Sequence, residues 1–105
     1  MAEYLYCRVS TDGQSTDAQT ISLMKKYPKA SVISETASGA KARPELKALI
    51  ERLGPGDILV VAAFDRLGRN VLDLLTMIQN LEAKRVSMVF DREGFVMDAN
   101  EDEKG

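Results

Sequence analysis

Ile-Leu-Val-Val-Ala-Ala-Phe, residues 58–64, is an unbroken apolar run that follows the turn residues Gly54-Pro55-Gly56. An apolar run of this length, without alternating polar residues, is typical of a parallel strand that helices cover on both faces. We therefore place this segment at the centre of a sheet. The rest of the chain is expected to supply flanking strands and covering helices.

The N-terminal segment has the alternation of a strand. Leu5, Cys7 and Val9 alternate with Tyr6 and Arg8. This period of two is typical of a strand with two distinct faces. Cys7 is assigned to the core face, opposite Arg8.

The remaining segments predict helices that alternate with strands. Thr16–Gln19 matches a helix capping box, and Pro44 stands where the first turn of a helix tolerates proline. An apolar stripe at helical spacing follows Pro44, formed by Leu46, Leu49, Ile50 and Leu53. The other expected elements are a short strand over 31–34, a polar loop over 65–70, a helix with Leu72, Leu75, Ile78 and Leu81 on its packed side, and a last strand over 86–90. The order βαβαβαβ predicts an α/β three-layer sandwich with a central, mainly parallel sheet.

Length, charge and cysteine content limit the function classes. The 105 residues fit one domain, and the first 90 carry 12 basic and 10 acidic side chains. That balance is too weak for a self-sufficient DNA-binding domain, so DNA affinity is expected to come from elsewhere. The single cysteine suits a reducing compartment. Without a membrane span or signal peptide in the sequence, we expect a cytoplasmic protein.

Polar and basic residues follow the expected strands. In open α/β sheets, ligands bind beyond the carboxyl ends of the strands. The residues at that edge, or in loops leading into helices there, are Arg8, Ser10, Arg43, Asp65, Arg66 and Arg69. A serine hydroxyl among guanidinium groups suits a phosphodiester, because arginine binds phosphate oxygens bidentately and neutralises transition-state charge.

Missing residues narrow the chemistry. The chain has no histidine, which excludes a Ser-His-Asp or Cys-His mechanism and a zinc site built on histidine. The phosphatase spacing fails too, because Gly13 stands six residues after Cys7. No Walker sequence or dinucleotide fingerprint is present. Phosphoryl transfer with a serine nucleophile and arginine electrostatics remains.

Three motifs together resemble the resolvase/invertase family of serine recombinases. They are Tyr-Cys-Arg-Val-Ser-Thr-Asp-Gly-Gln at 6–14, Ala-Ser-Gly-Ala at 37–40 before Arg43-Pro44, and Gly-Asp-Ile-Leu-Val-Val with Asp-Arg-Leu-Gly-Arg within 56–69. The resemblance implies a resolvase-like fold and the catalytic domain of a site-specific DNA recombinase. Ser10 would attack the scissile phosphate, form a covalent 5′-phosphoserine and free a 3′ hydroxyl.

The resemblance also implies roles, residue by residue. The implied catalytic residues are Ser10, Arg8, Arg43, Asp65, Arg66 and Arg69, and the implied assisting phosphate or DNA contacts are Gln14, Gln19 and Tyr6. No metal or cofactor is implied. The implied partners are DNA and further copies of the chain, in a dimer and a synaptic tetramer. The base that takes the proton from Ser10 is left open between Asp12, Asp65, water and an arginine.

Several of these residues have a simpler interpretation. Gln19 fits the capping box as well as a phosphate contact, and Arg8 could be an exposed strand residue. Asp65 and Arg66 could form a local ion pair, which is compatible with both roles. Tyr6 is better explained as structural.

The C-terminal segment departs from the family pattern. We expect residues 1–94 to form the catalytic domain and residues 95–105 to form an acidic, flexible tail. The long dimerisation helix and the C-terminal DNA-binding domain of family members have no counterpart here, so the chain alone is not expected to complete recombination. Two other functions stay open, a non-catalytic module for protein association and a generic phosphate- or nucleotide-binding domain.

Overall fold

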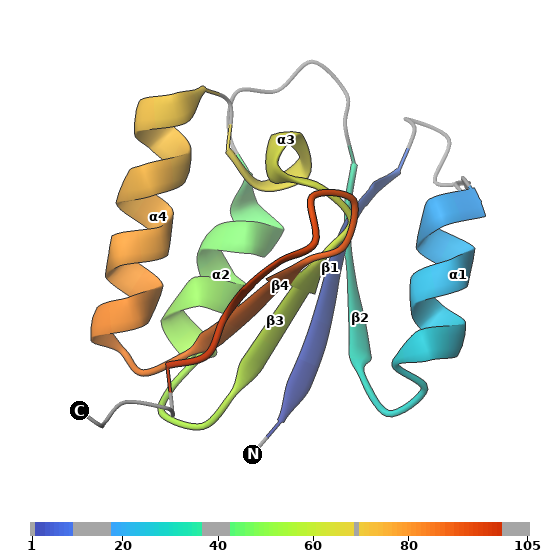
Figure 1. Cartoon of the computed structure of the whole chain (residues 1–105), viewed down its shortest axis with the longest axis horizontal. Coiled ribbons are helices and arrows are strands. Elements are labelled where there is room, and N and C mark those ends of the chain that lie inside the picture. Colours follow the sequence, from blue (N-terminus) through green and yellow to red (C-terminus); the bar gives the residue numbers. More distant parts are fainter. Residues whose placement is uncertain (1, 10–17, 37–42, 69, 100–105) are drawn as a thin grey trace.

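A five-stranded sheet forms the middle layer of the protein, in the order β2-β1-β3-β4-β5 (Figure 1). The computed structural model describes residues 2–9, 18–36, 43–68 and 70–99. The strands are β1 (Glu3–Val9), β2 (Ser31–Thr36), β3 (Ile58–Val61), β4 (Ser87–Phe90) and β5 (Phe95–Met97). β1 to β4 are parallel, and β5 is antiparallel to β4. The prediction of a mainly parallel sheet with β3 at its centre is confirmed.

Helices cover both faces of the sheet. α1 (Ala18–Lys26) packs Leu23 against Leu5 and Val60 on one face. α2 (Pro44–Arg52) and α4 (Val71–Ala83) pack on the opposite face, where Tyr6 belongs to their core cluster. Because Leu5 and Tyr6 are consecutive in β1, they point to opposite faces. The predicted three-layer sandwich is confirmed.

The helix predicted at Pro44 forms as expected. Pro44 occupies the first turn of α2, where its missing N–H is not needed. Leu46, Leu49 and Leu53 are each at most 2% exposed, so the apolar stripe read from the sequence is the packed face. α1 also lies where a helix was expected, although Thr16 and Asp17 of its predicted capping box lie outside the described residues.

The central strand is shorter than its apolar run. β3 ends at Val61, and α3 (Phe64–Leu67) begins three residues later, which corrects the prediction of a polar loop over 65–70. Ala63 is fully buried, and the Phe64 ring lies 4.8 Å from the Phe90 ring between centroids. The residues of the apolar run after Val61 therefore contribute to core packing and are not part of β3. A helix of four residues is too short to produce a helical period in the sequence.

The packed face of α4 also differs from the prediction. Leu72 is 75% exposed and Leu75 is 49% exposed, whereas Leu81 is buried. The side chains that pack against the core with Leu81 and the predicted Ile78 are Leu74 and Met77. Steps of three residues, as in 72, 75, 78 and 81, drift around a helix of 3.6 residues per turn, so the first half of the predicted stripe is rotated off the core.

Regular structure continues beyond Gly94. We expected a flexible tail from residue 95, and β5 corrects this expectation for Phe95–Met97, which pair with Phe90, Val89 and Met88 of β4. A strand of three residues at the sheet edge, two of them exposed, has too little alternation to be read from a sequence. In the part of the chain described here, no helix has the length and apolar character needed to cross a membrane.

Candidate active site

The carboxyl ends of β1 and β3 lie side by side in the sheet (Figure 1). Arg8 precedes the last residue of β1, and Asp65 and Arg66 lie in α3, directly beyond β3. The predicted convergence of these three residues on one sheet edge follows from the parallel pairing. Ser10, Gln14 and Arg69 lie outside the described residues, as does the side chain of Gln19.

A buried carboxyl group beneath this edge was not singled out in the sequence. Glu35, in β2, is 2% exposed, and its Oε1 accepts a 2.9 Å hydrogen bond from the hydroxyl of Tyr6. The same carboxyl group accepts hydrogen bonds from the backbone N–H groups of Glu45 at 3.0 Å and Leu46 at 2.9 Å. These two N–H groups belong to the first turn of α2, where no intrahelical acceptor exists. Glu35 therefore caps α2 from a neighbouring strand.

The environment of Tyr6 favours its structural interpretation. Tyr6 is fully buried, and its hydroxyl is engaged with Glu35. Burial, followed by the hydrogen bond to Glu35, raises the pKa of the Tyr6 phenol well above its usual range. The phenol therefore stays neutral and donates to the carboxyl group across the physiological pH range.

Arg8 carries an unsatisfied donor at the end of β1. It is the register partner of Glu35 across the β1–β2 pair and is only partly exposed. Its Nε is buried and has no hydrogen-bond partner among the residues that the structure describes. A buried guanidinium donor without an acceptor is costly, and an anion would relieve that cost. Arg8 thus suits an anionic ligand better than it suits the role of a simple exposed strand residue.

Arg43 is held between α3 and α4. Its side chain is 9% exposed and forms a 2.9 Å ion pair between Nη2 and Oδ2 of Asp73. Its Nη1 donates a hydrogen bond to the backbone carbonyl of Leu67. The predicted proximity of Arg43 to the α3 segment is present, but a carboxylate already occupies part of its guanidinium.

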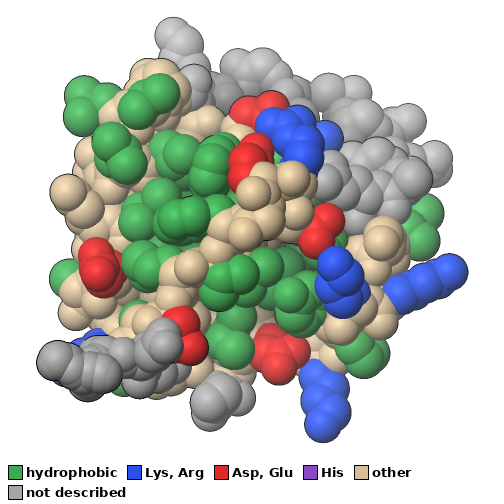
Figure 2. Space-filling view, viewed as in Figure 1, with side chains coloured by type: hydrophobic (Ala, Val, Ile, Leu, Met, Phe, Trp, Pro, Cys, Tyr) green, Lys and Arg blue, Asp and Glu red, His purple; other side chains and the backbone are tan. Residues whose placement is uncertain are grey.

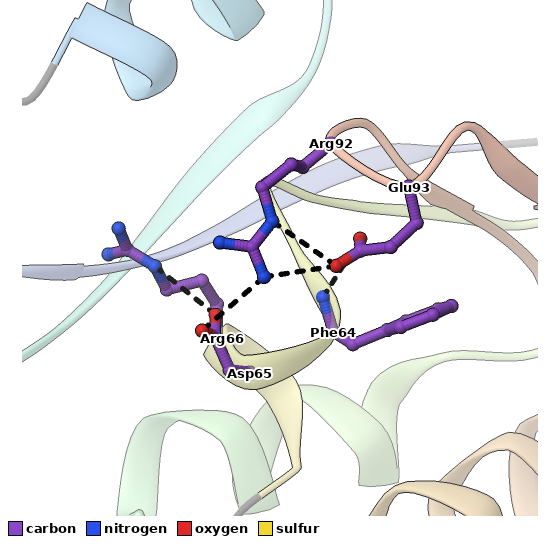
Figure 3. Close-up of polar contacts among 5 residues, drawn as sticks. All are labelled: Phe64, Asp65, Arg66, Arg92 and Glu93. Atoms are coloured by element: carbon purple, nitrogen blue, oxygen red, sulfur yellow. Dashed lines mark hydrogen bonds and ion pairs between the residues drawn. The ribbon is translucent and has the colours of Figure 1, made fainter.

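Asp65 lies between two arginines, as Figure 3 shows. Arg66 Nε is 3.8 Å from Asp65 Oδ1, so the local ion pair considered from the sequence is present. On the other side, Arg92 Nη2 is 3.4 Å from Asp65 Oδ2 and 3.1 Å from Glu93 Oε2. The hydrogen bond to Glu93, with the charge of Asp65, raises the pKa of Arg92.

The turn between β4 and β5 also supports α3 directly. Glu93 Oε1 accepts a 3.1 Å hydrogen bond from the backbone N–H of Phe64, the first residue of α3 (Figure 3). The rings of Phe64 and Phe95 lie 5.8 Å apart between centroids. The sequence did not predict this support, because Arg92 and Glu93 follow the last predicted strand and were given no role.

A hollow beside α3 does not suit a phosphate. Its volume is about 230 Å³, and it is lined by Phe64, Asp65, Gly68, Asn70, Val71 and Leu74. Among the lining residues that the structure describes, Asp65 is the one charged side chain, and its charge does not favour an anion. Figure 2 shows apolar side chains spread over one face of the molecule. Val71, which lines the hollow, and the neighbouring Leu72 are exposed. The basic edge at Arg8 and Arg66 remains the better phosphate site.

Metal ligands do not gather in the part of the chain that the structure describes. Within residues 2–9, 18–36, 43–68 and 70–99, no group of three or more His, Cys, Asp or Glu side chains is placed to hold a metal ion. The charged groups described at the site are guanidinium and carboxyl groups. Their chemistry is the binding of anions and the movement of protons.

A protein-family model matches almost the whole chain. The family model described as Resolvase, N terminal domain, matches residues 3–105. Transposon Tn552 DNA-invertase BinR of Staphylococcus aureus is 40% identical over 94 residues, which cover 89% of this chain and 48% of that protein. Transposon Tn3 resolvase of Escherichia coli is 34% identical over 97 residues, covering 90% of this chain and 52% of that protein. The chain thus spans about half the length of these two relatives.

A solved structure has the same fold. The resolvase family site-specific recombinase from Streptococcus pneumoniae superposes with a TM-score of 0.64, covering 98% of this chain and 78% of that chain. The sequence identity is 20%, so the likeness concerns the arrangement of strands and helices.

Proposed function

Because the chain belongs to the resolvase N-terminal domain family, we propose that it is the catalytic domain of a site-specific DNA recombinase. In this reaction the Oγ of Ser10 bonds to the scissile phosphorus, and the bond from phosphorus to the 3′ oxygen breaks. The 3′ oxygen takes up a proton and leaves as a hydroxyl, while the 5′ end stays attached to the protein as a phosphoserine. The reverse reaction with a new 3′ hydroxyl rejoins the DNA.

The observation that carries this proposal is the unsatisfied donor of Arg8. The Nε of Arg8 is buried and has no hydrogen-bond partner among the described residues. Arg8 stands two positions before Ser10 in the chain, near the end of β1, the strand that pairs with β3. A phosphate oxygen would supply the acceptor that this donor lacks. Arg66 and Arg43 bring two further guanidinium groups toward the same edge of the sheet, each with a carboxylate partner, Asp65 and Asp73. Arginine electrostatics of this kind stabilise the extra charge of a phosphoryl-transfer transition state.

The proposal extends to the partners of the protein. DNA is the substrate, and the protein works as a homo-oligomer, a dimer that assembles into a synaptic tetramer, in the cytoplasm. The reaction needs no metal and no nucleotide cofactor, because the phosphoserine conserves the energy of the phosphodiester bond. Arg69 is proposed to act as a catalytic residue, and Gln14 and Gln19 are proposed to assist at the phosphate. The proton acceptor for Ser10 stays open between Asp12, Asp65, water and an arginine.

The test is the capture of the covalent intermediate. The chain is fused to a DNA-binding domain of known target and incubated with duplexes that carry this target beside a randomised segment. Denaturation then traps protein joined to DNA, and mass spectrometry after nuclease digestion locates the phosphate. We expect the adduct on Ser10 and on a 5′ end.

Matched variants decide the assignment. Ser10→Ala is expected to abolish the adduct, whereas Ser22→Ala, at an exposed position in α1, is expected to leave it unchanged. An adduct that persists in Ser10→Ala overturns the nucleophile. If the parent fusion forms no adduct at all, the non-catalytic association module becomes the better account.

A further inference from the structure

Two acceptors on either side of the α3–α4 connection bind the guanidinium of Arg43, and we call them the acceptor pair. The two acceptors are the Leu67 carbonyl at the end of α3 and the Asp73 carboxylate in the first turn of α4. They contact different nitrogens, Nη1 and Nη2, so together they fix the plane of the guanidinium. A guanidinium has five N–H donors, and these contacts use two of them. The others form no hydrogen bond with the residues that the structure describes and are available to an anion.

The backbone of this connection is held in place independently of Arg43. Asn70 caps α4, because its Oδ1 accepts a 2.8 Å hydrogen bond from the Asp73 N–H. Gly68 allows the connection to approach α4 closely, since a Cβ at this position would lie 2.7 Å from the Cα of Leu74. Both features fix the backbone from which the Asp73 side chain extends. The acceptor pair is therefore preorganised rather than assembled by the arginine.

The backbone of Arg43 is also anchored. Arg43 immediately precedes Pro44 and α2, and the start of α2 is capped by the buried carboxyl group of Glu35. The Arg43 side chain thus reaches from a fixed helix start to a fixed acceptor pair. At 9% exposure it has little contact with solvent, so the negative charge of Asp73 compensates a cation that water hydrates poorly.

We propose that Asp73 is a positioning residue for Arg43. With the Leu67 carbonyl, it sets the orientation in which the remaining donors of Arg43 meet a phosphate oxygen. The proposal rests on the proposed function for the role of Arg43 at the phosphate, but the orientation itself is a property of this chain. Replacing a carboxylate that orients a metal-binding side chain costs about 10- to 100-fold in affinity or activity, and we expect an effect of the same order for a carboxylate that orients an anion-binding arginine.

The first test measures the orientation in the chain itself. NMR of the labelled 105-residue protein gives the rate of rotation about the Cζ–Nε bond of each arginine. In the parent, we expect Arg43 to rotate more slowly than the exposed Arg85, which serves as an internal reference. Equal rates would refute the proposal without any variant. This comparison also decides the matter if a substitution at Asp73 prevents folding.

The second part of that test uses Asp73→Asn, which keeps the shape and removes the charge. The rotation rate of Arg43 is expected to rise on the order of tenfold, as loss of a charge-assisted hydrogen bond implies. Glu82→Gln makes the same charge change at an exposed position of the same helix and is expected to have no effect. An unchanged rate in Asp73→Asn, or an equal change in both variants, overturns the proposal.

The third measurement separates positioning from simple structural support. In the DNA-binding fusion, Asp73→Asn is expected to slow adduct formation about 10-fold, at the low end of the range for such supporting carboxylates. Ile78→Val trims the core under α4 and lowers stability without touching Arg43, and it is expected to leave the rate unchanged. Equal slowing by both variants means that Asp73 acts through stability alone. Failure of the parent fusion would count against the proposed function, and the rotation rates would still decide the positioning.

Discussion

Replacing Glu35 by alanine tests whether one buried carboxyl group holds both Tyr6 and the start of α2 in place. The substitution removes the acceptor for three donors, the Tyr6 hydroxyl and the backbone N–H groups of Glu45 and Leu46. None of these donors has an obvious replacement, because Tyr6 is fully buried and the two N–H groups belong to the first turn of a helix.

The size of the effect follows from the number of donors. Each donor that loses its acceptor costs about 1 to 1.5 kcal/mol, so three give a loss of about 3 to 4.5 kcal/mol in the free energy of unfolding. Tyr6→Phe removes one donor and leaves the cap of α2 intact, so its expected loss is about 1 kcal/mol. Because the double variant loses no further bond, Tyr6→Phe should add little to Glu35→Ala.

Urea denaturation with a constant m-value measures these differences. Glu51→Ala is the matched control, because Glu51 is an exposed glutamate in α2. We expect it to change the free energy of unfolding by less than about 0.5 kcal/mol. A loss in Glu35→Ala no larger than that in Tyr6→Phe would refute the role of Glu35 as a shared acceptor.

Two further predictions concern Gly68 and Tyr6. Gly68→Ala is expected to destabilise the protein by about 1 to 3 kcal/mol in the same assay. The reason is that the new Cβ would lie 2.7 Å from the Cα of Leu74. Gly54→Ala is the control and should be near neutral, because the space around its new Cβ is open. Equal effects at the two glycines would contradict this account. The raised pKa of Tyr6 means that, above a pH of about 10, the unfolded chain loses a proton that the folded chain keeps, so stability falls as the pH rises. Unfolding at pH 8 and pH 11 should show this loss in the parent and a smaller one in Tyr6→Phe, and identical losses would speak against the buried neutral phenol.

Long, regular patterns in the sequence predicted the fold well. The apolar run at 58–64, the alternation around Cys7 and the stripe after Pro44 each led to the correct element, because burial imposes a period that a single sequence displays. Short elements were missed for the same reason. α3 has four residues and β5 has three, and neither length contains a period.

The candidate site was predicted in part. The sequence placed Arg8, Asp65 and Arg66 at one edge of the sheet, because parallel strands end together. It did not predict the acceptors that hold Arg43 and the start of α3. Asp73 lies 30 residues from Arg43 in the chain, and Glu93 lies 29 residues from Phe64. No local sequence pattern encodes such distant pairs. Glu35 could have been noticed as a carboxylate near the end of a strand, but its three donors come from β1 and α2.

The strand order has a consequence for how such a site can vary. β1 and β3 are neighbours although β2 separates them in sequence, and the chain leaves β1 toward α1 on one face and β3 toward α4 on the other. The two helices therefore lie on opposite faces of the sheet, and ligands of open α/β sheets bind where the direction of the connections changes in this way. Substitutions near the ends of β1 and β3 can change what is bound there, while the change of direction persists for as long as the sheet does.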